Sequence, residues 1–342
     1  MIRSQGQAPP LGAGAARPTL PLSGCSFGWL HLAPLPDALR ALARQGFRSL
    51  ELTTAPPHPS ADAIGPYERL ELGRLLDDLR LRVVSVNPSC ADLNLVSTNA
   101  EIREVSERQL IANIELAADL GTDYVVVIPG RRHALAPAPA QAARAVLDQG
   151  LTRLVARAEA LGVTIALENS PYGYLGRAGD LAEIVDSWSS PRLRITYDVA
   201  NALAIEDPAE GVRRAGDRIA LAHVSDTWRG KWAHTSPGRG EVDFTGFAKA
   251  LSQIGFDGPT VYELVDGDDP EPRMPADLAA LASAGWPRDP PVGRSGRGGQ
   301  RRRRPHGRPG RGGGRGRRPP GGTRRAARRH DRAVRRTSLG AG

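Results

Sequence analysis

Cysteine is scarce in this chain, because only Cys25 and Cys90 occur among its 342 residues. Two thiols cannot build a disulfide framework, and no group of cysteines is present that could hold a metal ion through sulfur. Long apolar runs are missing too. No stretch approaches the roughly 20 apolar residues of a membrane span, and the Pro-, Gly- and Ala-rich residues 1–19 have no apolar core of a signal peptide. We therefore expect a cytoplasmic protein with a flexible N-terminus at residues 1–19 and no membrane partner.

Lysine is almost absent, with 2 Lys against 44 Arg, and the arginines are unevenly distributed. The formal net charge of +9 alone suggests a nucleic-acid-binding protein. However, residues 291–342 hold 18 Arg and one Asp, a net charge of +17, so the rest of the chain has 28 basic and 36 acidic residues and a net charge of −8. Residues 1–290 therefore have no electrostatic reason to bind phosphate backbones.

The composition changes sharply after Pro287 into an Arg- and Gly-rich tail. Residues 288–342 have too few apolar side chains to bury a core, and we expect this segment to be disordered. Two interpretations of the tail stay open. Such segments can bind RNA non-specifically, or a very GC-rich gene has been read out of frame beyond the end of the domain.

Residues 20–287 alternate short β-branched runs with longer helical patterns, which is typical of repeated βα units and a parallel sheet. The predicted strands are residues 22–27, 48–53, 82–87, 123–128, 163–168, 194–199, 219–224 and 260–265. The predicted helices are residues 35–46, 67–80, 100–121, 140–162, 180–188, 208–217, 243–255 and 276–286. Eight βα units of this size predict a (β/α)8 TIM barrel as the catalytic domain. A doubly wound sheet is disfavoured, because no Gly-rich phosphate loop follows the first strand.

Four of the predicted strands end in a side chain that can bind a metal: Glu168, Asp198, His223 and Glu263. Each stands where an apolar run stops, and successive members lie one βα unit apart. In a barrel they come from consecutive strands and converge above the mouth, where active sites of this fold are built. Any one of them alone would be read as a helix cap, an ion pair or a core group.

Three carboxylates in a partly desolvated barrel mouth repel one another, and a divalent cation would resolve the conflict. Oxygen ligands with one imidazole and no sulfur favour Mn²⁺, Mg²⁺ or Co²⁺, with Zn²⁺ as a further alternative. We therefore predict one divalent metal ion as the cofactor.

Further candidates are ambiguous. Asn87 could hydrogen-bond a sugar hydroxyl or form an ordinary turn. His234 and the glycines of residues 238–240 could bind substrate or belong to a lid or a plain turn. Glu51 could reach the pocket or face a helix, and we expect the latter. Trp232 could form an apolar wall for a sugar ring or simply cover a loop.

The four strand ends occur together with NLVSTN (residues 94–99), PGRGEVDF (237–244) and GFDGPTVYELV (255–265). With these motifs, the chain resembles the xylose-isomerase-like TIM-barrel superfamily of sugar phosphate isomerases and epimerases over about residues 20–287. Relatives in that superfamily include keto-sugar 3-epimerases, inosose and dehydroshikimate dehydratases, and type IV apurinic endonucleases.

The resemblance to the epimerase branch implies that the four ligands hold one ion and that Glu168 and Glu263 form an acid/base pair. It also implies substrate contacts by Arg229, six residues after His223. Asn201 stands where that branch has a histidine and is a further candidate for substrate binding. Tyr174 stands where the branch has a glutamate, and these two departures argue against carrying over the branch's keto-sugar substrate. The extra histidines of the endonuclease branch are missing, which argues against a trinuclear zinc site.

These observations predict a metal-dependent isomerase or epimerase of a sugar or sugar phosphate. The metal would stabilise an enediolate while one glutamate removes a proton and the other returns it. If the enediolate instead expels a hydroxyl, the protein is a dehydratase of the inosose or dehydroshikimate type. A non-catalytic RNA-associated protein that acts through its tail is the alternative of another class. The resemblance is also compatible with a homo-oligomer.

Overall fold

The computed structural model describes residues 20–89 and 92–288. Within them, eight parallel strands close into a barrel in the order β1-β10-β7-β6-β5-β4-β3-β2. The strands are β1 (Leu22–Cys25), β2 (Ser49–Thr53), β3 (Arg82–Asn87), β4 (Tyr124–Val127), β5 (Thr164–Glu168), β6 (Leu193–Asp198), β7 (Ile219–Val224) and β10 (Thr260–Tyr262). Every predicted strand is present in the barrel, so the prediction of a (β/α)8 fold is confirmed.

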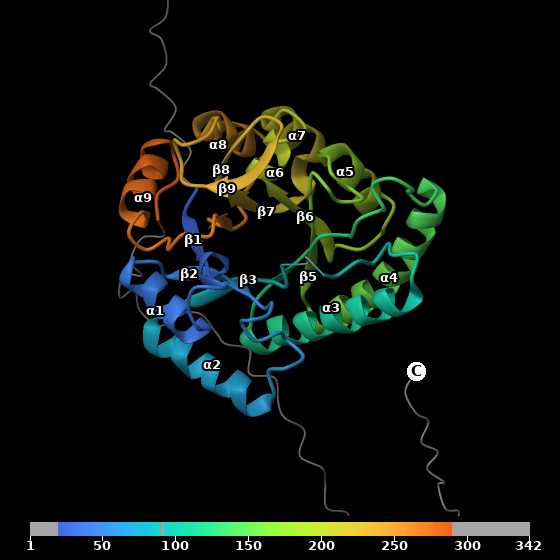
Figure 1. The fold of residues 1–342 in the computed structure, drawn as a ribbon, viewed down its shortest axis with the longest axis horizontal. Coiled ribbons are helices and arrows are strands. Elements are labelled where there is room, and N and C mark those ends of the chain that lie inside the picture. The colour runs from blue at the N-terminus through green and yellow to red at the C-terminus, as the bar shows by residue number, and fades with distance from the viewer. Residues whose placement is uncertain (1–19, 90–91, 289–342) are drawn as a thin grey trace, which may run out of the picture. The chain divides into compact units, whose positions relative to one another are not determined.

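Helices surround the barrel on its outside (Figure 1). They are α1 (Leu35–Arg44), α2 (Pro66–Leu79), α3 (Ala100–Leu120), α4 (Ala140–Leu161), α5 (Ala178–Asp186), α7 (Pro208–Ala215), α8 (Phe244–Gln253) and α9 (Met274–Ser283). The two longest, α3 and α4, end at Gly121 and Gly162, whose φ angles of 68° and 75° favour glycine. In the described part of the chain, none of the helices combines the length and the hydrophobicity that a membrane crossing requires.

Several short elements were not predicted. They are α6 (Val199–Leu203), the antiparallel hairpin of β8 (Asp226–Trp228) and β9 (Lys231–Thr235), and the 3-10 turns η1 (Phe27–Trp29) and η2 (Gly216–Arg218). Helix α6 follows β6 without a loop, because the Asp198 side chain accepts a hydrogen bond from the Asn201 backbone and caps the helix. The hairpin was missed because its strands are short and largely polar, so they carry no hydrophobic periodicity.

The apolar residues form two separate cores. A large core lies between the strands and the helices, and it includes Leu50 and Leu52 of β2 and Tyr197 of β6. A small core fills the barrel interior and consists of Cys25, Val84, Val126, Leu221 and Val261. Strand alternation therefore directs one set of side chains outward and the other inward. The inward set closes the barrel below the strand ends, which makes it a floor for a site at the mouth.

Two shifts in strand register align polar side chains inside the barrel. Between β6 and β7, Ile195 pairs with Ile219 but Thr196 pairs with Leu221, so that Asp198 lies opposite His223. A similar shift between β2 and β3 places Glu51 opposite Ser85. Such β-bulges re-aim side chains and are frequent beside active sites.

The described chain ends one residue beyond the predicted domain boundary at 287. Arg288 forms a bridge with Leu22 and donates a hydrogen bond to the carbonyl of Gln45, so it still belongs to the barrel. The predicted flexible N-terminus, residues 1–19, and all of the predicted disordered tail, residues 288–342, except Arg288 lie outside the described residues. Both stay predictions.

Candidate metal centre

The four predicted ligands lie together at the carboxyl ends of neighbouring strands. Glu168 and Asp198 are the last residues of β5 and β6, His223 is the last but one of β7, and Glu263 directly follows β10. Each offers one ligand atom, and these atoms lie within 4.8 Å of one another. All four side chains are buried: Asp198 and His223 are 0% exposed, and the two glutamates are 4% exposed.

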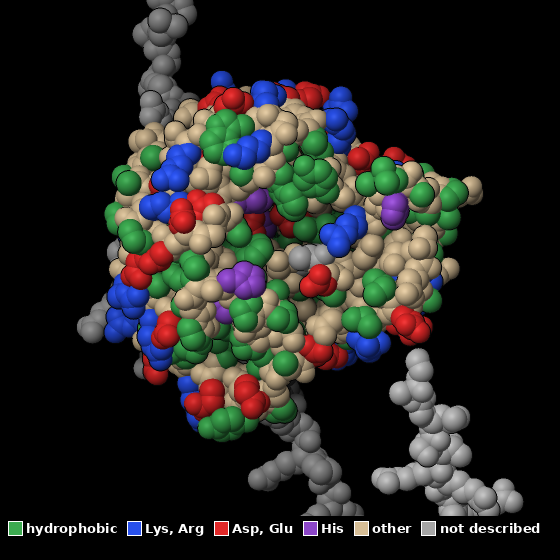
Figure 2. Space-filling view, viewed as in Figure 1, with side chains coloured by type: hydrophobic (Ala, Val, Ile, Leu, Met, Phe, Trp, Pro, Cys, Tyr) green, Lys and Arg blue, Asp and Glu red, His purple; other side chains and the backbone are tan. Residues whose placement is uncertain are grey.

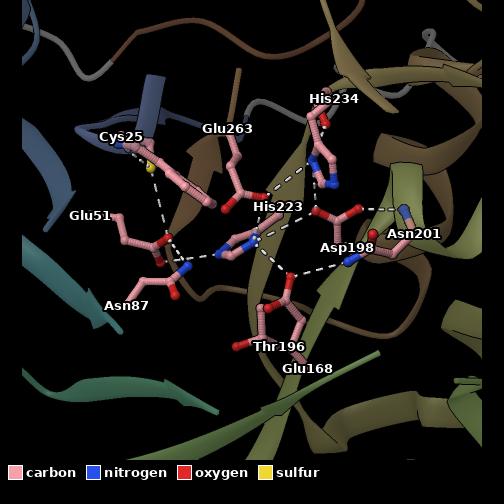
Figure 3. A network of polar contacts seen from close by, with 12 residues as sticks. Cys25, Glu51, Asn87, Glu168, Thr196, Asp198, Asn201, His223, His234 and Glu263 are labelled. Carbon is pink, nitrogen blue, oxygen red and sulfur yellow. Dashed lines mark hydrogen bonds and ion pairs between the residues drawn. The ribbon is translucent and has the colours of Figure 1, made fainter. Parts of the chain in front are cut away.

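The imidazole of His223 is the centre of this cluster (Figure 3). Its Nδ1 lies 3.2 Å from Glu168 Oε1, 3.3 Å from Glu263 Oε2 and 3.7 Å from Asp198 Oδ2. Two donor atoms that are each about 2.1 Å from one ion are separated by roughly 3–3.5 Å. The separations to Glu168 and Glu263 fall within this range and the one to Asp198 is slightly longer, so the spacing suits ligands around a single ion.

Two atoms of the cluster support this interpretation directly. His223 Nδ1 and Asp198 Oδ2 are buried and have no hydrogen-bond partner among the described residues. A buried polar atom without a partner costs free energy, so such atoms need an explanation. Three carboxylates and one imidazole are a donor set that suits a hard or borderline divalent cation. The residues therefore fit the predicted metal ion.

Burial and the neighbouring charges shift the pKa values of several groups in and beside the cluster. Burial raises the pKa of Glu168 to about 7. Burial also opposes the charge of Glu263, but His223 and His234 hold the pKa of this carboxyl well below its ordinary value. Burial likewise opposes the protonation of His234, yet Asp198 and Glu263 raise its pKa to about 9. Without a cation, Glu168 therefore holds its proton up to about pH 7, and Glu263 depends on the two histidines for its charge.

The direction of the Glu51 side chain differs from the one expected from the sequence. Glu51 was expected to face a helix, but its side chain is 0% exposed and points into the barrel interior (Figure 3). It accepts hydrogen bonds from Ser85 Oγ at 2.7 Å and from Asn87 Nδ2 at 2.8 Å. Its Oε2 also lies 3.1 Å from His223 Nε2. The strand SLELT carried the signal: Leu50 and Leu52 face outward, so Glu51 between them must face inward.

Asparagines hold the β5 and β6 ligands in place. Asn169 Nδ2 donates to the carbonyl of Asp198, and Asn169 Oδ1 accepts from the Asp198 amide. Asn201 Nδ2 donates to Glu168 Oε1 at 3.3 Å and to the Asn169 carbonyl at 2.9 Å. Its Oδ1 accepts a hydrogen bond from the indole of Trp232 on β9. The unpredicted hairpin is thereby connected to the ligand cluster.

A cavity of about 460 Å³ opens above the cluster. Figure 2 shows a hollow near the middle of this face, with histidine and acidic side chains visible inside it. The cavity is lined by Phe27, Asn87, Ser89, Leu93, Ile128, Gly130, Arg131, Glu168, Ser170, Tyr172, Gly173, Asn201, Trp232, Ala233, His234, Glu263 and Val265. Glu168 and Glu263 therefore reach both the cluster and the cavity, as a pair acting on a bound molecule would have to.

The predicted substrate-binding residues divide into two groups. His234, Asn87 and Asn201 line the cavity, and His234 Nδ1 lies 3.3 Å from Glu263 Oε2. Arg229 does not reach it: the side chain is exposed beside the turn between β8 and β9, and its backbone amide binds Glu241. The structure does not support the role that the resemblance implied for Arg229, and that role stays a prediction.

Fold and cluster together define a TIM-barrel protein with a candidate metal centre at the carboxyl ends of its strands. A family model described as "Xylose isomerase-like TIM barrel" matches residues 39–284. The chain therefore belongs to the xylose isomerase-like TIM-barrel family, as its motifs indicated.

Individual relatives agree with this assignment. The chain is 30% identical over 245 residues to the uncharacterized protein MJ1311 of Methanocaldococcus jannaschii, covering 68% of this chain and 81% of that protein. It is 22% identical over 247 residues to fructoselysine 3-epimerase of Shigella flexneri, covering 70% of this chain and 89% of the epimerase. Among solved structures, a D-tagatose 3-epimerase-like protein superimposes with a TM-score of 0.68 at 25% identity, covering 78% of this chain and 97% of that one.

Proposed function

We propose that the protein is a divalent-metal-dependent epimerase or isomerase of a sugar, with Glu168 and Glu263 as its acid/base pair. One observation carries this proposal: a buried cluster that fits one metal ion forms the base of a cavity into which both glutamates project. The names of the similar proteins, fructoselysine 3-epimerase and D-tagatose 3-epimerase-like protein, support a sugar as the substrate.

Glu168, Asp198, His223 and Glu263 would hold the ion. When bound, a divalent ion polarises a carbonyl group and stabilises the negative charge that develops on its oxygen. The glutamates do the remaining chemistry. One of them removes the proton from the carbon next to the carbonyl, and the other returns a proton. Return to the opposite face of the same carbon gives an epimer, and return to the neighbouring carbon gives an isomer.

The cavity wall favours an uncharged sugar over a sugar phosphate. Among the described residues that line it, Arg131 and His234 are the basic side chains, and Arg131 is exposed. His234 lies against Glu263, so its charge is already paired. Phe27, Tyr172 and Trp232 contribute aromatic surface on which the apolar face of a sugar ring could lie.

Solvent deuterium exchange tests this proposal. The full-length protein, supplied with Mn²⁺, is incubated in D₂O with ketoses, sugar phosphates and inososes, and the products are followed by NMR. We expect deuterium at the carbon beside the carbonyl of at least one ketose. Replacing either glutamate (Glu168→Gln or Glu263→Gln) should slow this exchange by about 10²-fold or more. The matched control is Glu206→Gln, at a largely buried carboxylate outside the cavity lining.

Three results would argue against the proposal. Absence of exchange with every compound would contradict a proton-transfer enzyme of this kind. Exchange that survives both glutamate substitutions would contradict the acid/base assignment. Release of water from the substrate would show a dehydratase instead of an epimerase or isomerase.

A further inference from the structure

We propose that Glu51 is a positioning residue that fixes the proton and the ring orientation of His223, so that Nδ1 presents its lone pair to the metal ion. Glu51 lies on β2, on the far side of the barrel interior from β5 and β6, and it touches the edge of the His223 ring that faces away from the other ligands (Figure 3). This inference rests on the proposed function, because it assigns His223 as a metal ligand.

The contact between the two side chains determines which ring nitrogen carries the proton. His223 Nε2 lies 3.1 Å from Glu51 Oε2, and both side chains are 0% exposed. An ionised carboxylate can only accept a hydrogen bond, so Nε2 is the donor. In the neutral ring the lone pair then lies on Nδ1, the atom that faces Glu168, Asp198 and Glu263. A histidine that binds metal usually donates its other N–H in this way.

The surroundings of Glu51 keep its carboxylate in the accepting role. Ser85 Oγ donates to Oε2, and Asn87 Nδ2 donates to Oε1. Asn87 cannot turn its amide around without loss, because its Oδ1 accepts from the Ser89 backbone amide at 2.7 Å. Three donors from β3 and β7 therefore converge on one buried carboxylate. The register shift between β2 and β3 contributes to this arrangement by placing Ser85 opposite Glu51.

A second metal site at Glu51 is less compatible with these contacts. Ligand atoms of Cys25, Glu51 and Glu263 also lie within 4.8 Å of one another. However, both oxygens of Glu51 are already occupied by donors, and Cys25 Sγ is 3.9 Å from Oε1. An ion there would have to displace the Nε2 proton of His223. The geometry therefore favours a carboxylate that orients a ligand over one that binds an ion itself.

The substitution Glu51→Gln tests whether this carboxylate orients His223. The new amide nitrogen must replace one of the two carboxylate oxygens. At the Oε1 position it would oppose the Asn87 donor. At the Oε2 position it would oppose the Nε2 proton of His223 and favour its transfer to Nδ1, where it blocks the metal. We expect the affinity for Mn²⁺, measured by calorimetry on the full-length protein, to fall by about 10- to 100-fold. Glu51→Asp keeps the charge with a shorter reach and should recover part of this loss.

The control is Glu206→Gln, which makes the same chemical change at a largely buried carboxylate that accepts from the Tyr197 hydroxyl and the Ala178 amide. It should leave the Mn²⁺ affinity unchanged even if it lowers stability. A purely structural role for Glu51 would likewise lower stability without changing the affinity of the folded molecules. An affinity of Glu51→Gln within twofold of the wild type would overturn the inference.

A second readout does not depend on metal binding. In the full-length chain with ¹⁵N-labelled histidine, the wild type should show a hydrogen-bonded Nε2 proton on His223, and Glu51→Gln should lose it or move it to Nδ1. A wild-type spectrum without that proton would overturn the inference even if Glu51→Gln failed to fold. A wild type that binds no Mn²⁺ but shows the proton would count against the proposed function alone.

Discussion

At the residue scale, the candidate site is a group of buried carboxylates that has no Lys or Arg partner among the described residues. In residues 20–89 and 92–288, the ion pairs of Glu168, Asp198 and Glu263 involve only His223 and His234. Buried charges without adequate partners are costly, because each has lost its hydration. A bound cation would therefore stabilise these carboxylates. Without one, His223 and His234 are their partners.

The pH dependence of metal binding follows from the carboxyl groups. Burial raises the pKa of Glu168 to about 7, so in the metal-free protein this group is protonated below that pH and ionised above it. A metal ion must displace the proton, which means that binding weakens as the pH falls. We expect the Mn²⁺ affinity at pH 6 to be about tenfold or more below that at pH 8. Calorimetry in buffers of different ionisation enthalpy would also count the released protons, and an affinity equal at both pH values would be inconsistent with this mechanism.

At the element scale, one buried carboxylate anchors the loop that follows the β8–β9 hairpin. Asp226 is 1% exposed and accepts hydrogen bonds from the backbone amides of Thr227, Gly238, Gly240 and Val242. Its removal leaves several amides without a partner, and hydrogen bonds to a charged group are each worth about 1.5–3 kcal/mol. We expect Asp226→Ala to lower the free energy of unfolding by roughly 3 kcal/mol, measured by urea denaturation.

Asp217 provides the comparison for this substitution. Its side chain is 89% exposed, and its contact with Arg218 is long at 3.9 Å. Asp217→Ala should therefore change the free energy of unfolding by no more than about 0.5 kcal/mol. Similar losses for the two variants would show that the loop does not depend on Asp226.

The elements that could be predicted from the sequence are those with a strong periodic signal. The barrel strands and the helices α1 and α7 show it clearly, and the four ligands were found because each ends an apolar run. Glu51 escaped that rule because it stands inside a strand, although the alternation of Leu50 and Leu52 marks its direction. The hairpin and the β6–β7 register shift have no comparable signal, because short polar strands and bulges depend on the packing of the closed barrel.

At the scale of the whole molecule, the proposed enzyme and its basic tail carry net charges of opposite sign. Residues 1–290 carry a net charge of −8 and residues 291–342 a net charge of +17. The last described contacts of the barrel come from Trp286 and Arg288, which lie before residue 291. Removing residues 291–342 should therefore leave metal binding and deuterium exchange unchanged. Any RNA binding, with its steep dependence on salt, should disappear.

The same truncation tests the alternative of a tail-driven protein. If exchange activity fell with the tail, the tail would contribute to catalysis or to the stability of the barrel. If RNA bound equally well to residues 1–290 in a filter-binding assay across a salt series, the acidic barrel would have an affinity that its charge does not predict.

The most direct test is a calorimetric titration of the metal-stripped full-length protein with Mn²⁺, alongside the His223→Ala variant and the Glu206→Gln control. One ion per chain should bind to the wild type and to the control, and His223→Ala should lose most of this affinity. A wild type that binds no ion, or a His223→Ala variant that binds as tightly as the wild type, would contradict the assignment of Glu168, Asp198, His223 and Glu263 as a metal centre.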